Sequence, residues 1–403
     1  MTPALQSLAV KVAKISAKTR WVFVEITRGD GAIGVGEATL AGSEQAVLQA
    51  AAEYVPCLWF FGAAQPDAFA AAVAPTNLVQ AAVVSAVDLA LWDLRARDQG
   101  VRLVDALGGA HRESVPMYAN INRRTEVRTA EGFAQSARDA LAVGYGALKL
   151  APFDEVSPLV CARGDGIAAM QAGLSRVAAV RAVSGPKRRL MVDCHWRFDE
   201  TTAARMIDAL AELHVHWVEC PLLETDANLP ALVRLRRRAN AHGILLAGME
   251  NGIGSGSFLP FCEAGAYDVM MPDVKYVGGL REMLRCAELF ASHGVAMSPH
   301  NPSGPIAHAA SLHVSAAMEC FDMLELQFDE SPLFDTLVAG ELPMRERGAS
   351  ALSVAPGLGV RLDAPSLEAH MDPAPRVWKA PRKHDASDAA SSPNQRSPVE
   401  DAE

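Results

Sequence analysis

Residues 190–200, LMVDCHWRFDE, join a short apolar run to several charged side chains. The first three residues are typical of a buried β-strand. Asp193, His195 and Arg197 follow that run directly. Burying such groups is costly unless they are paired or bind a metal. The stretch therefore predicts a strand that ends at a functional site, where these charged groups are paired or bind a metal.

Short apolar segments of this kind recur along most of the chain. From about residue 115, short apolar segments alternate with helix-length segments, and 202–213 and 281–294 show the apolar spacing of amphipathic helices. Helical crossovers between strands indicate a parallel sheet, and eight strands in one run favour a closed β/α barrel over an open doubly wound sheet, which is the alternative. The predicted strands cover 115–121, 146–151, 189–194, 216–220, 244–249, 268–273, 295–300 and 323–328.

The chain ends differ from this central region. Residues 8–40 alternate as strands do, with a Gly-Asp-Gly turn at 29–31, and helical patterns follow at about 43–55 and 79–99. We therefore predict an α+β domain over 1–114 and a barrel over 115–329. Residues 379–403 are rich in Pro, Ser, Asp and Ala and predict a disordered tail.

Composition narrows the classes of function. The net charge of −10 argues against a nucleic-acid partner, which usually needs a basic surface. No apolar run of about eighteen residues and no signal-peptide pattern is present, so we expect no membrane partner. The seven cysteines are scattered without a CxxC pair, which favours reduced thiols in a cytoplasmic protein. Cys194 and Cys220 are interpreted as small buried packing residues.

Three acids end consecutive predicted strands. Asp193, Glu219 and Glu250 are 26 and 31 residues apart, each about one strand-plus-crossover unit. A single acid in such a place more often caps the next helix, but three would meet at one mouth of the barrel, where barrel active sites lie. Three carboxylates repel one another unless a cation joins them, and oxygen ligands favour Mg²⁺ or Mn²⁺.

Two further strands end in an acid and a histidine. Asp273 and His300 lie 27 residues apart, again about one unit. Neighbouring strands lie about 4.8 Å apart, so the acid can hydrogen-bond the imidazole. A lone histidine is more often structural, but an acid at the matching place indicates a general base.

Other polar residues lie near these strand ends. Alternation along a strand places Asp193 and His195 on one face, so His195 is expected to face the substrate. Arg197 either binds a substrate carboxylate or leaves the site towards solvent.

Two lysines are open to more than one interpretation. Lys149 either forms a buried salt bridge or stabilises an enolate oxygen. Lys275 shares a face with Asp273 and is a candidate for a competing base, although a solvated loop lysine is more common. Glu325, near the end of the last strand, is another inward-facing candidate.

These motifs together resemble the enolase superfamily, in its mandelate racemase/muconate lactonizing enzyme group, over about residues 8–375. The resemblance implies a (β/α)7β barrel with an α+β capping domain, to which about 330–378 returns. The matching segments are VFVEITRGDGAIGVGEATL, AVDLALWDLRARDQGVRLVDALGG, VDCH, VECP, AGMENG, PDVKYVGG and SPHNPSGPIAHAA.

The resemblance also assigns roles to the candidate residues. It implies that Asp193, Glu219 and Glu250 bind Mg²⁺ and that Asp273 and His300 form the base dyad. Glu325, protonated if it donates, would stabilise the enolate together with Lys149, and His195 would protonate the leaving hydroxyl. Arg197 and Asn120 are further candidates for substrate contacts.

The departures from the family pattern point to one reaction. Racemases carry a Lys-x-Lys pair, but here Ala151 follows Lys149 at that spacing and cannot take a proton. His195 instead resembles the histidine of galactonate- and mannonate-type dehydratases, and Met249 stands where Gly is usual before the third ligand.

The resemblance thus implies a Mg²⁺-dependent dehydratase that converts a sugar acid, an aldonate or aldarate, to a 2-keto-3-deoxy acid. The alternatives are a cycloisomerase or one-base epimerase, or a non-catalytic relative that binds sugar acids. A homo-oligomer is expected from the resemblance alone.

Overall fold

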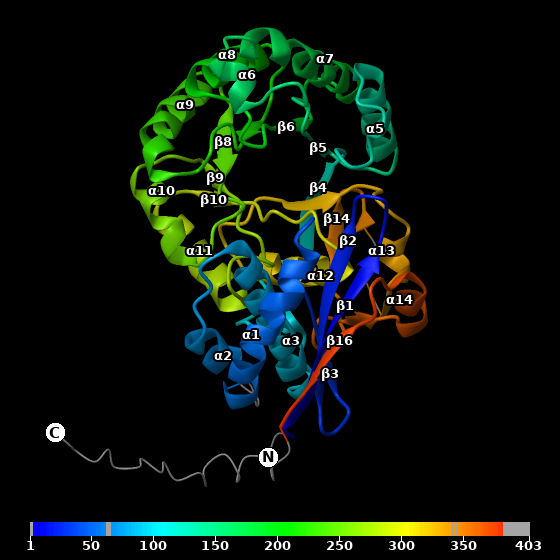
Figure 1. Ribbon diagram of the computed structural model, residues 1–403. Coiled ribbons are helices and arrows are strands. Elements are labelled where there is room, and N and C mark those ends of the chain that lie inside the picture. Colours follow the sequence, from blue (N-terminus) through cyan, green and yellow to red (C-terminus); the bar gives the residue numbers. More distant parts are fainter. Residues whose placement is uncertain (1–2, 62–65, 341, 343–344, 382–403) are drawn as a thin grey trace, which may run out of the picture.

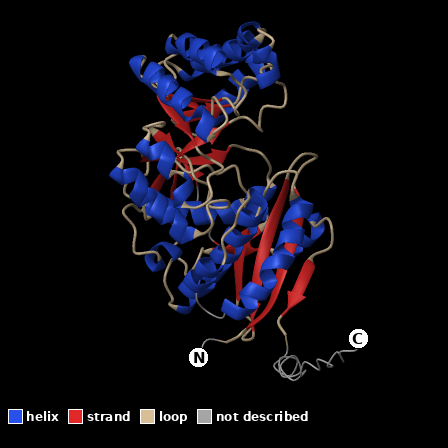
Figure 2. Ribbon diagram, turned by 60° about the vertical axis from the view of Figure 1, so that its left-hand side comes forward, coloured by secondary structure: helices blue, strands red, loops and turns tan. Residues whose placement is uncertain are grey.

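The computed structural model describes residues 3–61, 66–340, 342 and 345–381. Figure 1 shows a barrel surrounded by helices, with the N-terminal strands and helices packed beside one end of it. Figure 2 shows this arrangement from another side, with the long antiparallel strands apart from the barrel strands. Within these ranges, no helix is both long and apolar enough to cross a membrane.

The capping domain is a four-stranded antiparallel sheet covered by helices. Its strand order is β16-β1-β2-β3. Gly36 lets β3 lie directly on α3, because a Cβ at this position would overlap the carbonyl oxygen of Ala86. The elements are β1 (Leu5–Lys14), β2 (Arg20–Arg28), β3 (Ile33–Glu37), α1 (Glu44–Phe61), α2 (Pro66–Ala72), α3 (Leu78–Asp98), α4 (Leu103–Ala106) and β16 (Arg376–Lys379).

The barrel contains a strand that overlaps each segment predicted from the apolar runs. The ladders are parallel, although the last strands before closure are only two residues long because the segments soon turn into loops. The strands are β4 (Ser114–Asn120), β5 (Ala147–Leu150), β6 (Arg189–Asp193), β7 (Trp217–Glu219), β8 (Leu245–Gly248), β9 (Val269–Met270), β10 (Ala296–Met297) and β11 (Leu324–Gln327).

Helices connect successive barrel strands, as expected for the (β/α)7β fold. Their apolar faces join the strands' outer faces in the largest hydrophobic core. They are α5 (Ala130–Ala142), α6 (Pro158–Ala162), α7 (Gly166–Ser184), α8 (Glu200–Ala211), α9 (Leu229–Ala241), α10 (Leu259–Glu263), α11 (Leu280–Ser292) and α12 (Pro305–Ala316), with short 3₁₀ turns at Asp226–Asn228 and Ser255–Ser257.

The barrel closes between its first and last strands. β11 pairs in parallel with β4, which places Gln327 opposite Asn120. On its other side, the Ser298 hydroxyl after β10 donates to the carbonyl of Met323 at 2.7 Å. Closure therefore brings the strand-end residues of β4 and β11 side by side.

The C-terminal segment, predicted to return to the capping domain over about 330–378, contacts both domains. β14 pairs with the barrel strand β4, whereas β16 pairs with β1 of the capping sheet. The elements are α13 (Leu333–Thr336), β12 (Val338–Gly340), β13 (Arg345–Glu346), β14 (Ala349–Ala351), β15 (Val360–Leu362) and α14 (Ala364–His370).

The predicted tail boundary at residue 379 is too early. Lys379 pairs with Ser7 in the capping sheet, and the Ala380 N–H donates to the carbonyl of Gln6 at 2.9 Å. The rest of the predicted tail, residues 382–403, lies outside the described residues.

Candidate active site

A cavity of about 400 Å³ lies where the capping domain meets the mouth of the barrel. Thr39, Leu40 and Leu78 of the capping domain line one side of it. The barrel contributes residues from the ends of its strands. The size is at the lower end of the range for small-molecule sites. Its lining includes most of the predicted site residues, which the next paragraphs take in turn.

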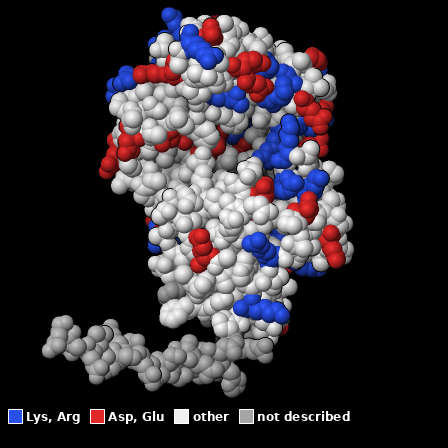
Figure 3. All heavy atoms as spheres, in the orientation of Figure 1, with Lys and Arg blue, Asp and Glu red and all other residues white. Residues whose placement is uncertain are grey.

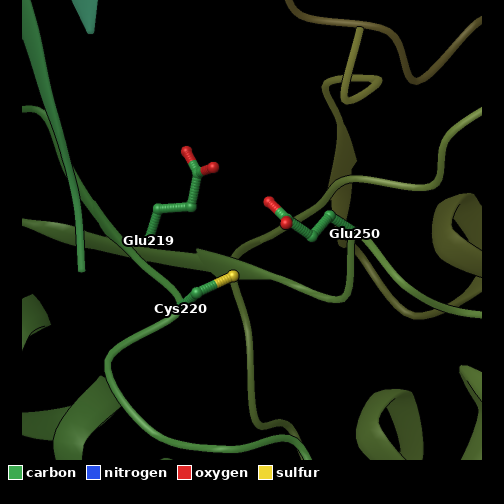
Figure 4. Close-up of side chains that lie close together, drawn as sticks. All are labelled: Glu219, Cys220 and Glu250. Carbon is green, nitrogen blue, oxygen red and sulfur yellow. The ribbon is translucent and has the colours of Figure 1, made fainter. Parts of the chain in front are cut away.

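The three predicted metal ligands lie at strand ends around this mouth, but the compact group of ligand atoms holds Glu219 and Glu250 without Asp193. Asp193 and Glu219 are direct neighbours in the β6–β7 register. One ligand atom each from Glu219, Glu250 and Cys220 lies within 4.8 Å of the others. Figure 4 shows the side chains of Glu219 and Glu250 extending towards one another, while Cys220 leaves the same strand end in another direction. Cys220, which the sequence suggested as a packing residue, is therefore also beside the acids.

The electrostatics of this cluster fit a divalent cation. Burial raises the pKa of Glu219 to about 8, and the nearby Asp193 adds to the shift while Lys149 opposes it. Burial also raises the pKa of Glu250. Carboxylates that are costly to ionise together become ionised when they ligate a hard cation, and oxygen donors suit Mg²⁺ or Mn²⁺. Asp193, Glu219 and Glu250 would hold that ion.

Lys149 forms the buried salt bridges that were one of its two interpretations. Its Nζ lies 2.7 Å from Glu219 and 2.9 Å from Glu325, and the side chain lines the cavity. Asn120 donates to Glu325 at 2.6 Å. Burial opposes ionisation of Glu325, but Lys149 and His300 outweigh it and lower the pKa of this carboxyl. Glu325 accepts from Asn120 and pairs with Lys149, so in this structure it does not act as the donor for which a proton would be needed, and it holds Lys149 in place.

The acid–histidine pair is present at the ends of β9 and β10. Nδ1 of His300 lies 2.8 Å from Asp273, and Nε2 lies 3.5 Å from Glu250. Burial lowers the pKa of His300, but Glu250 and Asp273 outweigh this effect, so the net shift is upwards. His300 therefore has one nitrogen fixed by Asp273 and the other directed to the acid cluster.

Lys275 is neither a solvated loop lysine nor a free competing base. It is 1% exposed, its Nζ lies 2.6 Å from Asp273, and it also donates to the Ser303 hydroxyl. Because Asp273 is shared between this lysine and His300, Lys275 helps to keep the carboxylate ionised. Its side chain does not line the cavity.

His195 reaches the site by a turn and not by strand alternation. β6 ends at Asp193, and His195 and Trp196 have positive φ angles of 46° and 55°. The turn brings His195 Nε2 to 2.7 Å from Asp193, and the ring lines the cavity. The charge of Asp193 is the main reason that the pKa of His195 rises to about 9, with burial acting against it.

Left-handed backbone recurs at the neighbouring strand ends. Cys220 follows β7 with φ 47°, and Met249 follows β8 with φ 69°. The second value explains why glycine is usual before the third ligand, since L-residues adopt such angles at a cost. Strained positions of this kind cluster at functional sites.

Glu224, a buried acid that the sequence interpretation missed, connects these turns. It accepts hydrogen bonds from the Met249 N–H, from Trp196 Nε1 at 3.2 Å and from the Tyr267 hydroxyl at 3.1 Å. The Cys220 thiol also donates to it, at 3.7 Å. Burial raises the pKa of Glu224 to about 7. Its position in a polar loop gave no sequence signal for this role.

Arg197 is not brought to the cavity. Its guanidinium donates to the carbonyls of Phe153, Asp154 and Val156 at 3.0–3.2 Å, and it does not line the cavity. It holds the loop after β5 and has no place in the substrate contacts proposed below. Asn120 does line the cavity, as do Arg123 and Gln327, which the sequence interpretation did not select.

Comparison with known proteins assigns the family. Residues 132–366 match the family "Enolase C-terminal domain-like", and residues 4–108 match the N-terminal domain of mandelate racemase/muconate lactonizing enzyme. The chain belongs to the enolase superfamily. Its membership of the mandelate racemase/muconate lactonizing enzyme group agrees with the resemblance seen in the strand-end motifs.

Relatives within this superfamily include two dehydratases. The D-galactonate dehydratase of Verminephrobacter eiseniae is 31% identical over 73% of this chain and 75% of its own length. The D-xylonate dehydratase of Haloferax volcanii is 26% identical over 90% of this chain and 88% of its own. A solved enolase protein from Sargasso Sea environmental sequencing aligns with a TM-score of 0.80 and 29% identity, over 94% of this chain and all of the other.

Proposed function

We propose that this enolase-superfamily enzyme is a Mg²⁺-dependent dehydratase that converts a sugar acid to a 2-keto-3-deoxy acid. The observation that carries the proposal is that one cavity holds the Asp273–His300 pair and, near the acids, a second histidine, His195. Dehydration needs a base for the α-proton and an acid for the leaving hydroxyl. The names of the relatives, which are dehydratases of aldonic acids, support the same class.

The proposed reaction begins with loss of the α-proton. Nδ1 of His300 is bonded to Asp273, so Nε2 accepts the proton from C2. The electron pair of the broken C–H bond moves into the substrate carboxylate. Lys149 offers its ammonium group to that charge from the cavity wall. When Mg²⁺ is bound by the acid cluster, it supplies further positive charge for the substrate carboxylate.

The second step removes the 3-hydroxyl. His195 gives a proton to this oxygen, the C3–O bond breaks, and the hydroxyl leaves as water. The electron pair from the carboxylate forms the C2–C3 double bond of an enol. Tautomerisation of that enol gives the 2-keto-3-deoxy acid, so atoms and charge balance without an added oxidant or reductant.

The rival functions use fewer of these residues. A two-base 1,1-proton transfer needs a second base, and the position two residues after Lys149, where racemases of the group carry a lysine, holds the buried Ala151. A one-base epimerase or cycloisomerase has no use for the proton that His195 offers. A binding protein has no use for the Asp273–His300 pair.

The metal requirement is tested with a library of sugar acids and a keto-acid assay. Activity should disappear with EDTA and return with Mg²⁺.

Two variants then test the proposal by separating the steps of the reaction. His300→Asn should lose both dehydration and exchange of the α-hydrogen in D₂O, because the base is gone. His195→Asn should lose about 10²–10⁴-fold in dehydration, the usual contribution of a general acid, yet retain α-hydrogen exchange.

The opposite results have clear meanings. Normal dehydration by His195→Asn would show that His195 is not the acid. Continued α-hydrogen exchange by His300→Asn would place the base elsewhere. Full activity in protein stripped of metal would contradict the role of the acid cluster.

A further inference from the structure

A buried polar atom without a partner lies in the cavity wall, away from the acid cluster. Gln327 ends β11, lines the cavity and is 8% exposed. Its side-chain Oε1 accepts no hydrogen bond from any residue in the described part of the chain. An unsatisfied buried acceptor is costly, so its presence in a cavity wall indicates a ligand donor.

The position of Gln327 shows which part of a ligand it would meet. It lies two residues after Glu325, so the two side chains share the inner face of the barrel. Glu325 bonds Lys149, which marks the level of the reacting carboxylate. Gln327 is one layer nearer the carboxyl end of the strand, and the capping residue Leu40 lines the same cavity. A sugar acid that reacts at Lys149 would therefore present its distal carbons to Gln327.

The neighbouring loop contributes a cation whose charge is already compensated. Arg123 lines the cavity three residues after Asn120, which pairs with Gln327. Its NH1 lies 2.9 and 3.0 Å from the two oxygens of Glu330. Thr19 of the capping domain donates to the same carboxylate at 2.8 Å. The capping domain thus helps to hold Glu330 against Arg123.

The other cations of the cavity wall are compensated too. Lys149 is paired with Glu219 and Glu325, His195 with Asp193, and His300 with Asp273. Among the residues that the structure describes, each cationic side chain lining this cavity has a carboxylate partner within 3 Å. A second carboxylate on a ligand would find no free positive charge there, and desolvating it would be costly.

We propose that Gln327 and Arg123 form a subsite for the uncharged, hydroxyl-bearing end of the substrate, so that the enzyme selects monocarboxylic aldonates over dicarboxylic aldarates. The inference rests on the proposed function, since it extends the same substrate within the same cavity. Hydroxyl groups donate to the Gln327 oxygen and accept from the Arg123 guanidinium, which fits both residues.

Ligand binding tests this subsite independently of turnover. The probes are six-carbon aldonates, aldarates of matching configuration, and four-carbon aldonates that lack the two distal carbons. Dissociation constants are measured by calorimetry on Mg²⁺-loaded full-length protein carrying His300→Asn, so that no ligand is consumed. We expect the aldonate to bind at least tenfold more tightly than its matching aldarate.

One variant removes the Gln327 amide, and another removes the carboxylate charge that pairs with Arg123. Gln327→Leu should weaken binding of the six-carbon aldonate by about 10- to 100-fold, as expected for a lost buried hydrogen bond, and leave the four-carbon aldonate unchanged. Without ligand it should not lower the melting temperature, because it removes an unsatisfied atom. Gln171→Leu, on the exposed face of α7, is the matched control. Glu330→Gln frees the charge of Arg123 and should shift preference towards the aldarate by about tenfold.

Each outcome decides between the two proposals. Aldonate binding without turnover by the unmodified chain would contradict the dehydratase and leave the subsite standing. Turnover combined with equal losses for four- and six-carbon ligands in Gln327→Leu would overturn the subsite alone. No binding of any aldonate, or tighter binding of aldarates by the unmodified cavity, would also overturn it.

Discussion

Single residues at the strand ends determine where the acids of this active site lie. His195, Cys220 and Met249 adopt left-handed backbone, which costs non-glycine residues about 1 kcal/mol or more each. Glu224 offsets part of this cost by bonding the Met249 N–H and the Cys220 thiol. Within the described part of the chain, no hydrogen bond joins Glu224 to the proposed ligands, so we propose it as a positioning residue for Glu250.

Removing the Glu224 carboxylate should therefore weaken metal binding. We expect Glu224→Leu to bind Mg²⁺ about 10–100-fold more weakly, the usual effect of losing a group that orients a ligand. Glu224→Gln keeps an oxygen for the Met249 N–H and should retain most of the affinity. Calorimetric titration of metal-stripped protein measures both. Unchanged affinity in a folded Glu224→Leu variant would show that Met249 holds its conformation unaided.

The sequence predicted the acids and the histidines better than it predicted their partners. Asp193, Glu219 and Glu250 were visible because acids end apolar strands at regular spacing. The sequence did not show that Lys275 pairs with Asp273, or that Arg197 donates to loop carbonyls instead of reaching the cavity. Both contacts depend on loop conformations, which the alternation of side chains along a strand does not predict. Gln327 could have been predicted as a cavity residue from the sequence, because it lies two residues after Glu325 on the same face of the strand.

Among the elements, the contact between β3 and α3 depends on a glycine. Gly36→Ala should lower the free energy of unfolding by about 1–3 kcal/mol, because the added methyl group meets the backbone of Ala86. Gly146→Ala is the matched control, since a Cβ there meets nothing within 4 Å. Urea unfolding measures both variants. Equal stabilities would mean that β3 moves away from α3 at little cost.

A buried acid joins α3 of the capping domain to α11 of the barrel. Asp88 accepts from the Leu280 N–H at 2.8 Å, and burial raises the pKa of Asp88 from 3.8 to about 7. The folded state then holds a proton that the unfolded state has released. The stabilisation is complete below pH 4 and is lost as the pH rises through 7.

Asp88→Asn should remove this pH dependence while keeping an oxygen for Leu280. We expect its stability relative to the unmodified chain to increase between pH 5 and pH 8. Urea midpoints at the two pH values give the comparison. A constant difference would show that Asp88 is ionised throughout this range.

Charged residues of both signs are interspersed over the barrel helices on the face drawn in Figure 3, and the capping part of that face carries fewer.

Polar contacts join the capping domain to the barrel. Glu37 of β3 accepts from the N–H groups of Gly304 and Ala307, which begin α12 just after His300. The capping domain therefore helps to hold the barrel loop that carries His300, the proposed base.

The C-terminal strand should matter to the molecule as a whole. A truncation after Pro375 removes β16 and uncovers the edge of β1, so we expect a lower melting temperature. A truncation after Pro381 keeps that strand and should match the full chain in melting temperature and rate. Loss of activity in the second truncation would show that residues beyond 381 contribute to the enzyme.

The pairing of β1 with β16 can form only after almost the whole described chain has been synthesised. About 360 residues separate the two strands. At roughly 5–20 residues per second, a ribosome needs on the order of 20–70 s to make the second after the first. Throughout that time the outer backbone edge of β1 lacks its pairing strand and is exposed to other chains.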